Sequence, residues 1–138
     1  MKTYSISEVA KELNLTVYTL RYYDKEGLMP FVERTASGTR LFKETDIDAL
    51  KVIECLKSTG MQIKEIKAFI DWCIDGDSTL QQRFNMFMER KAIVNKQFEE
   101  LKKTMELIEH KCFYYKTALE AGTEEIHKNN KIEIPITN

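Results

Sequence analysis

Apolar residues recur every three or four positions through most of the chain, which predicts a largely helical protein. A first short helix follows Ser5, because a serine with Glu8 three residues later forms the capping box that starts many helices. Asn14 ends this helix, since asparagine tolerates the left-handed backbone of helix ends. Thr16 then caps a second helix over residues 17–23. Two short helices joined by a tight turn predict a helix-turn-helix.

A β-hairpin and two further helices are expected to follow. Two β-prone runs, residues 31–33 and 39–42, flank a connection that contains Gly38, and this pattern predicts a hairpin. A hairpin directly after a helix-turn-helix is a wing. The apolar spacing then predicts one helix over residues 45–59 and another over residues 62–73.

The C-terminal half carries the clearest periodic signal, a seam of apolar residues that mostly alternates steps of three and four. Its members are Phe84, Phe87, Val94, Phe98, Leu101, Met105, Ile108, Cys112, Tyr115 and Leu119. A seam of about five heptads is typical of a coiled coil. Residues 84–119 would span roughly 54 Å as a helix, so a chain this small cannot bury both ends of it.

We therefore expect a homodimer that pairs along this seam, because a second copy is the simplest partner. The predicted dimer interface comprises Phe87, Val94, Phe98, Leu101, Met105, Ile108, Cys112 and Tyr115. The alternative is a helix that packs back on its own domain.

These elements predict a mainly α fold, with an N-terminal winged helix-turn-helix followed by a long dimerising coiled-coil helix. The expected domains are residues 1–76, which bind DNA, residues 77–120, which dimerise, and a short tail over residues 121–138. From Asn129 the helical period is lost, so we expect the end of the tail to be extended or disordered.

Composition narrows the class of protein only slightly. Lys and Arg number 21 against 22 Asp and Glu, so the net charge of −1 does not by itself indicate a nucleic-acid binder. The first 43 residues contain seven basic and five acidic residues, a weak excess of the expected sign. With widely spaced cysteines, no signal peptide and no membrane span, the sequence predicts a cytoplasmic protein with reduced thiols and no membrane partner.

Several segments of the N-terminal half together carry a specific signature. They are residues 4–10 with Thr16, residues 19–28 (Thr-Leu-Arg-Tyr-Tyr-Asp-Lys-Glu-Gly-Leu), residues 38–42 (Gly-Thr-Arg-Leu-Phe) and residues 60–66 (Gly-Met-Gln-Ile-Lys-Glu-Ile). In this order they resemble the helix-turn-helix, the second wing strand and the fourth helix of MerR-family transcription regulators. The resemblance covers residues 3–72 closely and residues 78–119 in architecture only.

The resemblance implies double-stranded promoter DNA as the partner. Members of this family bind pseudo-palindromic promoters as homodimers and distort the DNA so that RNA polymerase can engage promoter elements spaced too far apart. Contact with the polymerase is then indirect, through the promoter. An effector would favour the state of the dimer that distorts the DNA.

The resemblance also implies which side chains contact DNA. Base contacts set sequence choice and phosphate contacts fix the register. The candidates are Thr16, Tyr18 and Thr19 near bases, Arg21 and Tyr22 at phosphates, and Arg34, Ser37 and Arg40 in the wing. Two alternatives stay open: Tyr18 as a mere surface aromatic, and Arg40 as the ion-pair partner of an acidic residue.

Cys55 is the candidate for sensing an effector. The segment 55–60 resembles the third helix of the thiol-dependent branch of the family, which responds to aldehydes and other electrophiles as part of a stress response. Lys51 or Lys57, if near, would favour the thiolate that such chemistry needs. Against this, Cys55 borders an apolar helix face, where cysteine is commonly inert packing.

No metal or other cofactor is expected. Cys112 and His110 make a weak ligand pair, whereas zinc takes three or four protein donors. There is neither a Gly-rich phosphate loop nor a His-Glu-x-x-His helix, so the chain is not expected to be an enzyme. The alternative to a DNA-binding regulator is a coiled-coil protein-interaction module whose N-terminal domain docks a protein partner.

Overall fold

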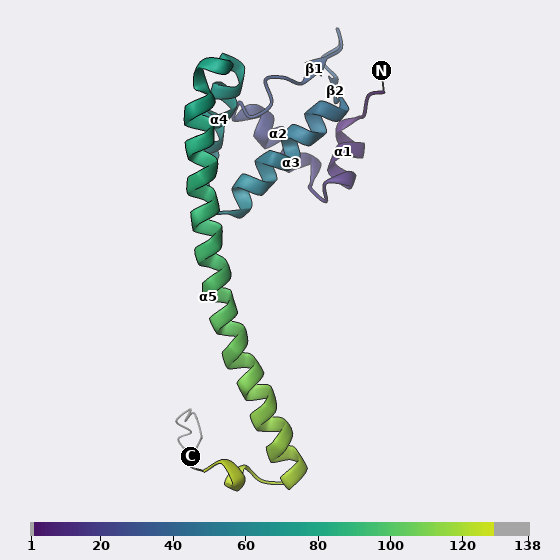
Figure 1. Ribbon diagram of the computed structural model, residues 1–138. Helices are drawn as coiled ribbons and strands as arrows, with labels where there is room; N and C mark the ends of the chain where they lie inside the picture. The colour runs from purple at the N-terminus through teal and green to yellow at the C-terminus, as the bar shows by residue number, and fades with distance from the viewer. Residues whose placement is uncertain (1, 129–138) are drawn as a thin grey trace. The chain divides into compact units, whose positions relative to one another are not determined.

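The computed structural model describes residues 2–128 and opens with the two predicted short helices (Figure 1). Helix α1 covers Ile6–Glu12 and helix α2 covers Val17–Lys25. The capping box is present: the Glu8 amide donates to Ser5 Oγ at 3.1 Å and the Ser5 amide donates to Glu8 Oε1 at 3.0 Å. These bonds lower the pKa of the Glu8 carboxyl. Asn14 has a φ of 55°, as its helix-ending role requires.

The wing is a short antiparallel hairpin. Strand β1 is Glu33–Arg34 and strand β2 is Arg40–Leu41, and Arg34 lies opposite Arg40. Both strands are shorter than the predicted runs, partly because Phe42 pairs with another segment: its backbone exchanges hydrogen bonds of 2.8 and 3.0 Å with Tyr4. Gly38 has a φ of 90°, a conformation that favours glycine, at the turn between the strands.

Helix α3 spans Glu44–Ser58 and helix α4 spans Ile63–Asp75, close to the predicted ranges. The start of α3 differs slightly from the prediction of a helix from residue 45. The Asp46 carboxylate accepts the backbone N–H of Lys43 at 2.8 Å, and this bond caps the helix one residue earlier.

One hydrophobic core joins the helices of the head to the end of the wing. Its fully buried members include Val9 of α1, Leu20 of α2, Ile53 of α3, and Phe42, which follows strand β2. Leu20 and Tyr23 direct one face of α2 into this core, so the opposite face of α2 is left outward. Burial of this kind is the main stabilising term for so small a head.

A turn of 3₁₀ helix, η1 (Asp77–Thr79), leads into helix α5, which runs unbroken over Leu80–Ala121. The chain divides into two compact units at Ile93 and Val94. The first unit includes the start of α5, because Phe87 packs edge-to-face on Phe69 of α4 with ring centroids 5.5 Å apart. It therefore continues past residue 76, where the sequence analysis placed a domain boundary.

In the second unit, a short 3₁₀ helix, η2 (Glu124–His127), packs on the end of α5. The Tyr114 hydroxyl donates to Glu124 at 2.9 Å, and the rings of Tyr114 and His127 stack with centroids 4.4 Å apart. Burial and the bond to Glu124 raise the pKa of Tyr114 to about 12. The tail predicted to begin at residue 121 is thus ordered at its start, and residues 129–138, which include the segment expected to be extended, lie outside the described residues.

Within residues 2–128, none of the helices has an apolar stretch long enough to cross a lipid bilayer.

Candidate nucleic-acid interface

The outward face of α2 carries five of the predicted DNA-binding residues. Thr16 is the N-cap: its Oγ1 accepts the Thr19 amide at 3.0 Å and lies 2.8 Å from the Thr19 hydroxyl. Tyr18 is 79% exposed, Tyr22 is 41% exposed, and Arg21 is exposed as well. The start of this helix therefore presents hydroxyl, phenol and guanidinium groups to solvent on a rigid, capped support.

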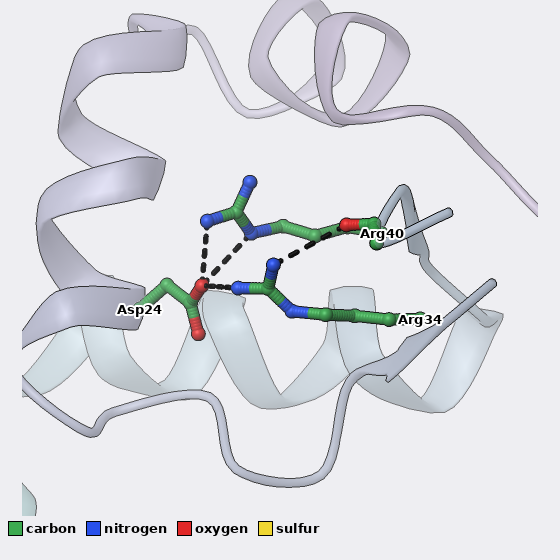
Figure 2. A network of polar contacts seen from close by, with 4 residues as sticks. Asp24, Arg34 and Arg40 are labelled. Carbon is green, nitrogen blue, oxygen red and sulfur yellow. Dashed lines mark hydrogen bonds and ion pairs between the residues drawn. The ribbon is translucent and has the colours of Figure 1, made fainter. Parts of the chain in front are cut away.

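The wing arginines are held against the end of α2 (Figure 2). Arg40 donates from Nε and Nη2 to Asp24 Oδ2 at 2.9 and 2.6 Å. Arg34 pairs with the same carboxylate oxygen through Nη2 and donates from Nη1 to the Gly38 carbonyl at 3.2 Å. Asp24 thus connects α2 to both strands of the hairpin.

This cluster changes the interpretation of both arginines. The ion-pair alternative for Arg40 describes the free protein correctly, and Arg34 has the same partner. Two guanidinium groups share one carboxylate, so the cluster keeps a net positive charge. Each guanidinium has five N–H donors, and these bonds use only two of them, which leaves donors for a phosphate.

Asp24 is the residue that the sequence analysis missed. It lies within the Arg-Tyr-Tyr-Asp segment that carried the family resemblance, yet an acidic residue beside basic ones attracted no role. Its place in the last turns of α2, three residues after Arg21, was the available signal.

Ser37 lies at the tip of the wing. Its side chain is exposed, and its hydroxyl is 2.9 Å from that of Thr35, whose Oγ1 also accepts the Thr39 amide at 3.1 Å. The tip is thus ordered by local hydrogen bonds and presents small polar groups.

The Cys55 side chain is exposed on α3 rather than packed, so the inert-packing alternative does not describe it. Its sequence neighbours Glu54 and Lys57 both bind the Tyr23 hydroxyl: the hydroxyl donates to Glu54 Oε2 at 2.5 Å and accepts from Lys57 Nζ at 2.9 Å. Burial and the bond to Glu54 raise the pKa of Tyr23, so the hydroxyl keeps its proton. The segment around Cys55 is therefore tied to α2.

On the single chain, most of the predicted seam residues of α5 are exposed to solvent. Val94 is partly buried and Cys112 is exposed, as are the remaining six: Phe87, Phe98, Leu101, Met105, Ile108 and Tyr115. Large apolar side chains left in solvent along one helix stripe indicate a surface that a partner covers. Among residues 2–128, no group of three or more His, Cys, Asp or Glu side chains is placed to hold a metal ion.

Asp24→Asn tests the connection between α2 and the wing. The amide keeps the shape but removes the charge that holds both arginines, so we expect trypsin to cut after Arg34 and Arg40 several-fold faster. The free energy of unfolding should fall by about 1 kcal/mol. Asp71→Asn, which breaks only the exposed pair with Lys67 on α4, is the control and should change neither quantity appreciably. Equal cleavage rates in both variants would contradict the role given to Asp24.

Comparison with known proteins places this geometry in a family. A family model for MerR HTH family regulatory proteins matches residues 4–71. An HTH-type transcriptional regulator of Haemophilus influenzae is 38% identical over 135 residues, which is 98% of each chain. The HTH-type transcriptional regulator AdhR of Bacillus subtilis is 36% identical over 87 residues, covering 63% of this chain and 62% of AdhR.

Solved structures agree with the sequence matches. HiNmlR, a MerR family regulator lacking the sensor domain and crystallised bound to promoter DNA, superposes with a TM-score of 0.83 at 38% identity, covering 91% of this chain and 99% of its own. A MerR family transcriptional regulator from Bacillus thuringiensis gives a TM-score of 0.74 at 41% identity, covering 80% and 97%. These relatives are regulators rather than enzymes. The chain belongs to the MerR family of DNA-binding, helix-turn-helix transcriptional regulators.

Proposed function

We propose that this regulator binds a pseudo-palindromic promoter as a homodimer, with α2 of each copy in the major groove and each wing on the flanking backbone. The observation that carries the proposal is the pairing of an exposed α2 face with wing arginines already held in place by Asp24. Ordering long side chains costs conformational entropy, so arginines that are fixed before binding lose less of it on the DNA.

The residues take different roles in this proposal. Thr16, Tyr18 and Thr19 are at the helix start, which is the part of a recognition helix that approaches base edges. The phosphate contacts come from Arg21, Tyr22, Arg34 and Arg40. Ser37, at the wing tip, contacts the DNA backbone. The HiNmlR crystal contains promoter DNA, which supports a duplex as the partner of this chain also.

The homodimer rests on the bare seam of α5. Phe98 and Leu101 are 67% and 64% exposed on the single chain, and the stripe continues at heptad spacing. Pairing with the same stripe of a second copy would remove these side chains from water, at about 1.5–3 kcal/mol for each fully buried residue. Two heads at a fixed separation then require two half-sites, which explains a pseudo-palindrome.

Distortion of the promoter is the proposed means of control. Bending and untwisting a duplex costs a few kcal/mol, and this cost is offset by additional protein–DNA contacts in the bent state. The dimer therefore has two DNA-bound states, and an effector acts by stabilising one of them. RNA polymerase enters this scheme only through the shape of the promoter.

Cys55 is the proposed effector site, and the effector is an electrophile such as an aldehyde. The Cys55 sulfur would add to the carbonyl carbon, and the thiol proton would end on the former carbonyl oxygen, giving a hemithioacetal with no other product. Two observations support the idea: the side chain is exposed, and its neighbours Glu54 and Lys57 hold Tyr23 of α2. An adduct at this position would disturb contacts that reach the DNA-reading helix.

Arg21→Ala tests DNA binding. Loss of one phosphate contact in each copy should weaken binding to a fragment with the promoter's inverted repeat by ten- to a hundredfold, and should lower the slope of log K against log salt by about two per dimer. Lys103→Ala on α5 is the control, and its affinity and slope should match the parent. A protein-docking module would instead ignore the duplex and keep its partner in the Arg21 variant, and that result would refute the proposal.

Leu101→Lys tests the dimer. Leu101 is exposed on the single chain, so the substitution leaves the head folded but places two charges in the paired seam, and we expect at least hundredfold weaker association. Sedimentation at micromolar concentration should show a dimer for the parent and a single chain for the variant. Leu107→Lys is a matched control, because Leu107 is also exposed but lies off the seam. If the parent protein sediments as a single chain, the proposed homodimer is refuted.

Cys55→Ser tests the electrophile response. The variant should bind promoter DNA normally but lose the change in transcription that an aldehyde produces in the parent. Cys73→Ser is the control, because Cys73 is exposed too but lies on α4, and it should keep the full response. If transcription from the promoter still responds to aldehyde when the Cys55 variant replaces the parent, Cys55 is not the sensor.

A further inference from the structure

A cavity of about 410 Å³ lies in the first unit, between α4 with its preceding turn and the first turns of α5. This volume falls in the range of small-molecule sites. Met61, Ala68, Trp72 and Met86 supply its apolar wall. None of the cavity residues has a place in DNA binding, in the predicted seam or in the Cys55 site.

An unsatisfied hydrogen-bond donor lies at this cavity. Arg90 lines it, and the Nε of Arg90 is buried without a hydrogen-bond partner among the described residues. A guanidinium is always protonated and can only donate. Because a buried N–H without an acceptor is unfavourable, this atom favours an acceptor that the described chain does not provide.

Two neighbouring polar groups bear on which ligand atoms could meet Arg90: one Glu65 oxygen is already engaged, and Asn85 offers a second donor. Glu65 Oε1 already accepts the Gln62 amide at 3.3 Å, as part of the cap of α4. Asn85 Oδ1 accepts from Gln81 Nε2 at 2.8 Å, so the Asn85 side chain offers its NH₂ group as a donor. Glu65 and Glu89 also line the cavity, and their charges disfavour a ligand with more than one negative charge.

We propose that this cavity binds a small aromatic monocarboxylate, whose carboxylate accepts a hydrogen bond from Arg90 Nε and whose ring packs on Trp72 and Met86. A carboxylate matches a guanidinium donor with a charge-assisted bond. Indole and thioether groups both make favourable contacts with an aromatic ring. The ligand would bridge α4 and α5, and its binding requires neither DNA nor Cys55.

The predicted dimer leaves this cavity open. In the first unit, the seam residues of α5 are Phe84 and Phe87, whereas the cavity takes residues 82, 85, 86, 89 and 90. At about 100° per residue, the centres of these two sets lie roughly 160° apart around the helix axis. A partner helix on the seam therefore does not occupy the site.

The chain contains a single tryptophan, and it lies in the cavity, so its fluorescence reports occupancy directly. We would titrate the full-length protein with benzoate, and with benzamide as the neutral isostere. The expected result is a saturable change in Trp72 emission with a millimolar Kd for benzoate, and at least tenfold weaker binding of benzamide. No saturable change, or equal affinity for the two compounds, overturns the proposal.

Variants locate the site. Arg90→Met should weaken benzoate binding at least tenfold, whereas Lys64→Met, which removes a charge from an exposed position on α4 outside the cavity, should leave it unchanged. If circular dichroism shows that the Arg90 variant is unfolded, Ala68→Leu decides, because it fills the cavity without removing a polar group. Loss of binding in that variant supports the site, and benzoate binding at the parental affinity refutes it.

Discussion

One oxygen of the Asp24 carboxylate joins helix α2 to the wing. Arg34 and Arg40 come from the two opposite strands of the hairpin and meet at this atom, so a two-stranded element with only two residues in each strand has a fixed position. An isolated hairpin of this size is not stable in water. The same contact leaves a surplus positive charge beside α2, where a phosphate backbone would lie in the proposed complex.

A second connection joins α2 to α3. The Tyr23 hydroxyl lies between a carboxylate and an ammonium group of α3, and the Tyr23 ring is buried in the core. Helix α2 is therefore held to the wing by Asp24 and to α3 by Tyr23. In the proposed function, a chemical change at Cys55 has a physical route to α2, because the adjacent Glu54 binds Tyr23.

Local sequence signals predicted the local structure well. Ser5 caps α1 and Asn14 ends it with a left-handed backbone, because both effects depend on residues a few positions apart. The fold class followed from the same kind of signal and the family from the resemblance of residues 3–72, and both are confirmed. The sequence alone does not identify the ion-pair partner of Arg40, because Asp24 lies 16 residues away and other acidic residues are equally available. The exposure of Cys55 likewise depends on which neighbours pack beside α3, and apolar spacing alone does not determine this.

The bare stripe on α5 has a consequence for how much active regulator a cell holds. On the proposed pairing, a newly made chain exposes this apolar surface until a second copy covers it, so dimerisation competes with aggregation during synthesis. On the proposed pairing, at low abundance the amount of two-chain species rises with the square of chain number. A modest change in gene expression would then alter promoter occupancy more than proportionally, giving the cell a sharper dosage response than a one-chain regulator allows.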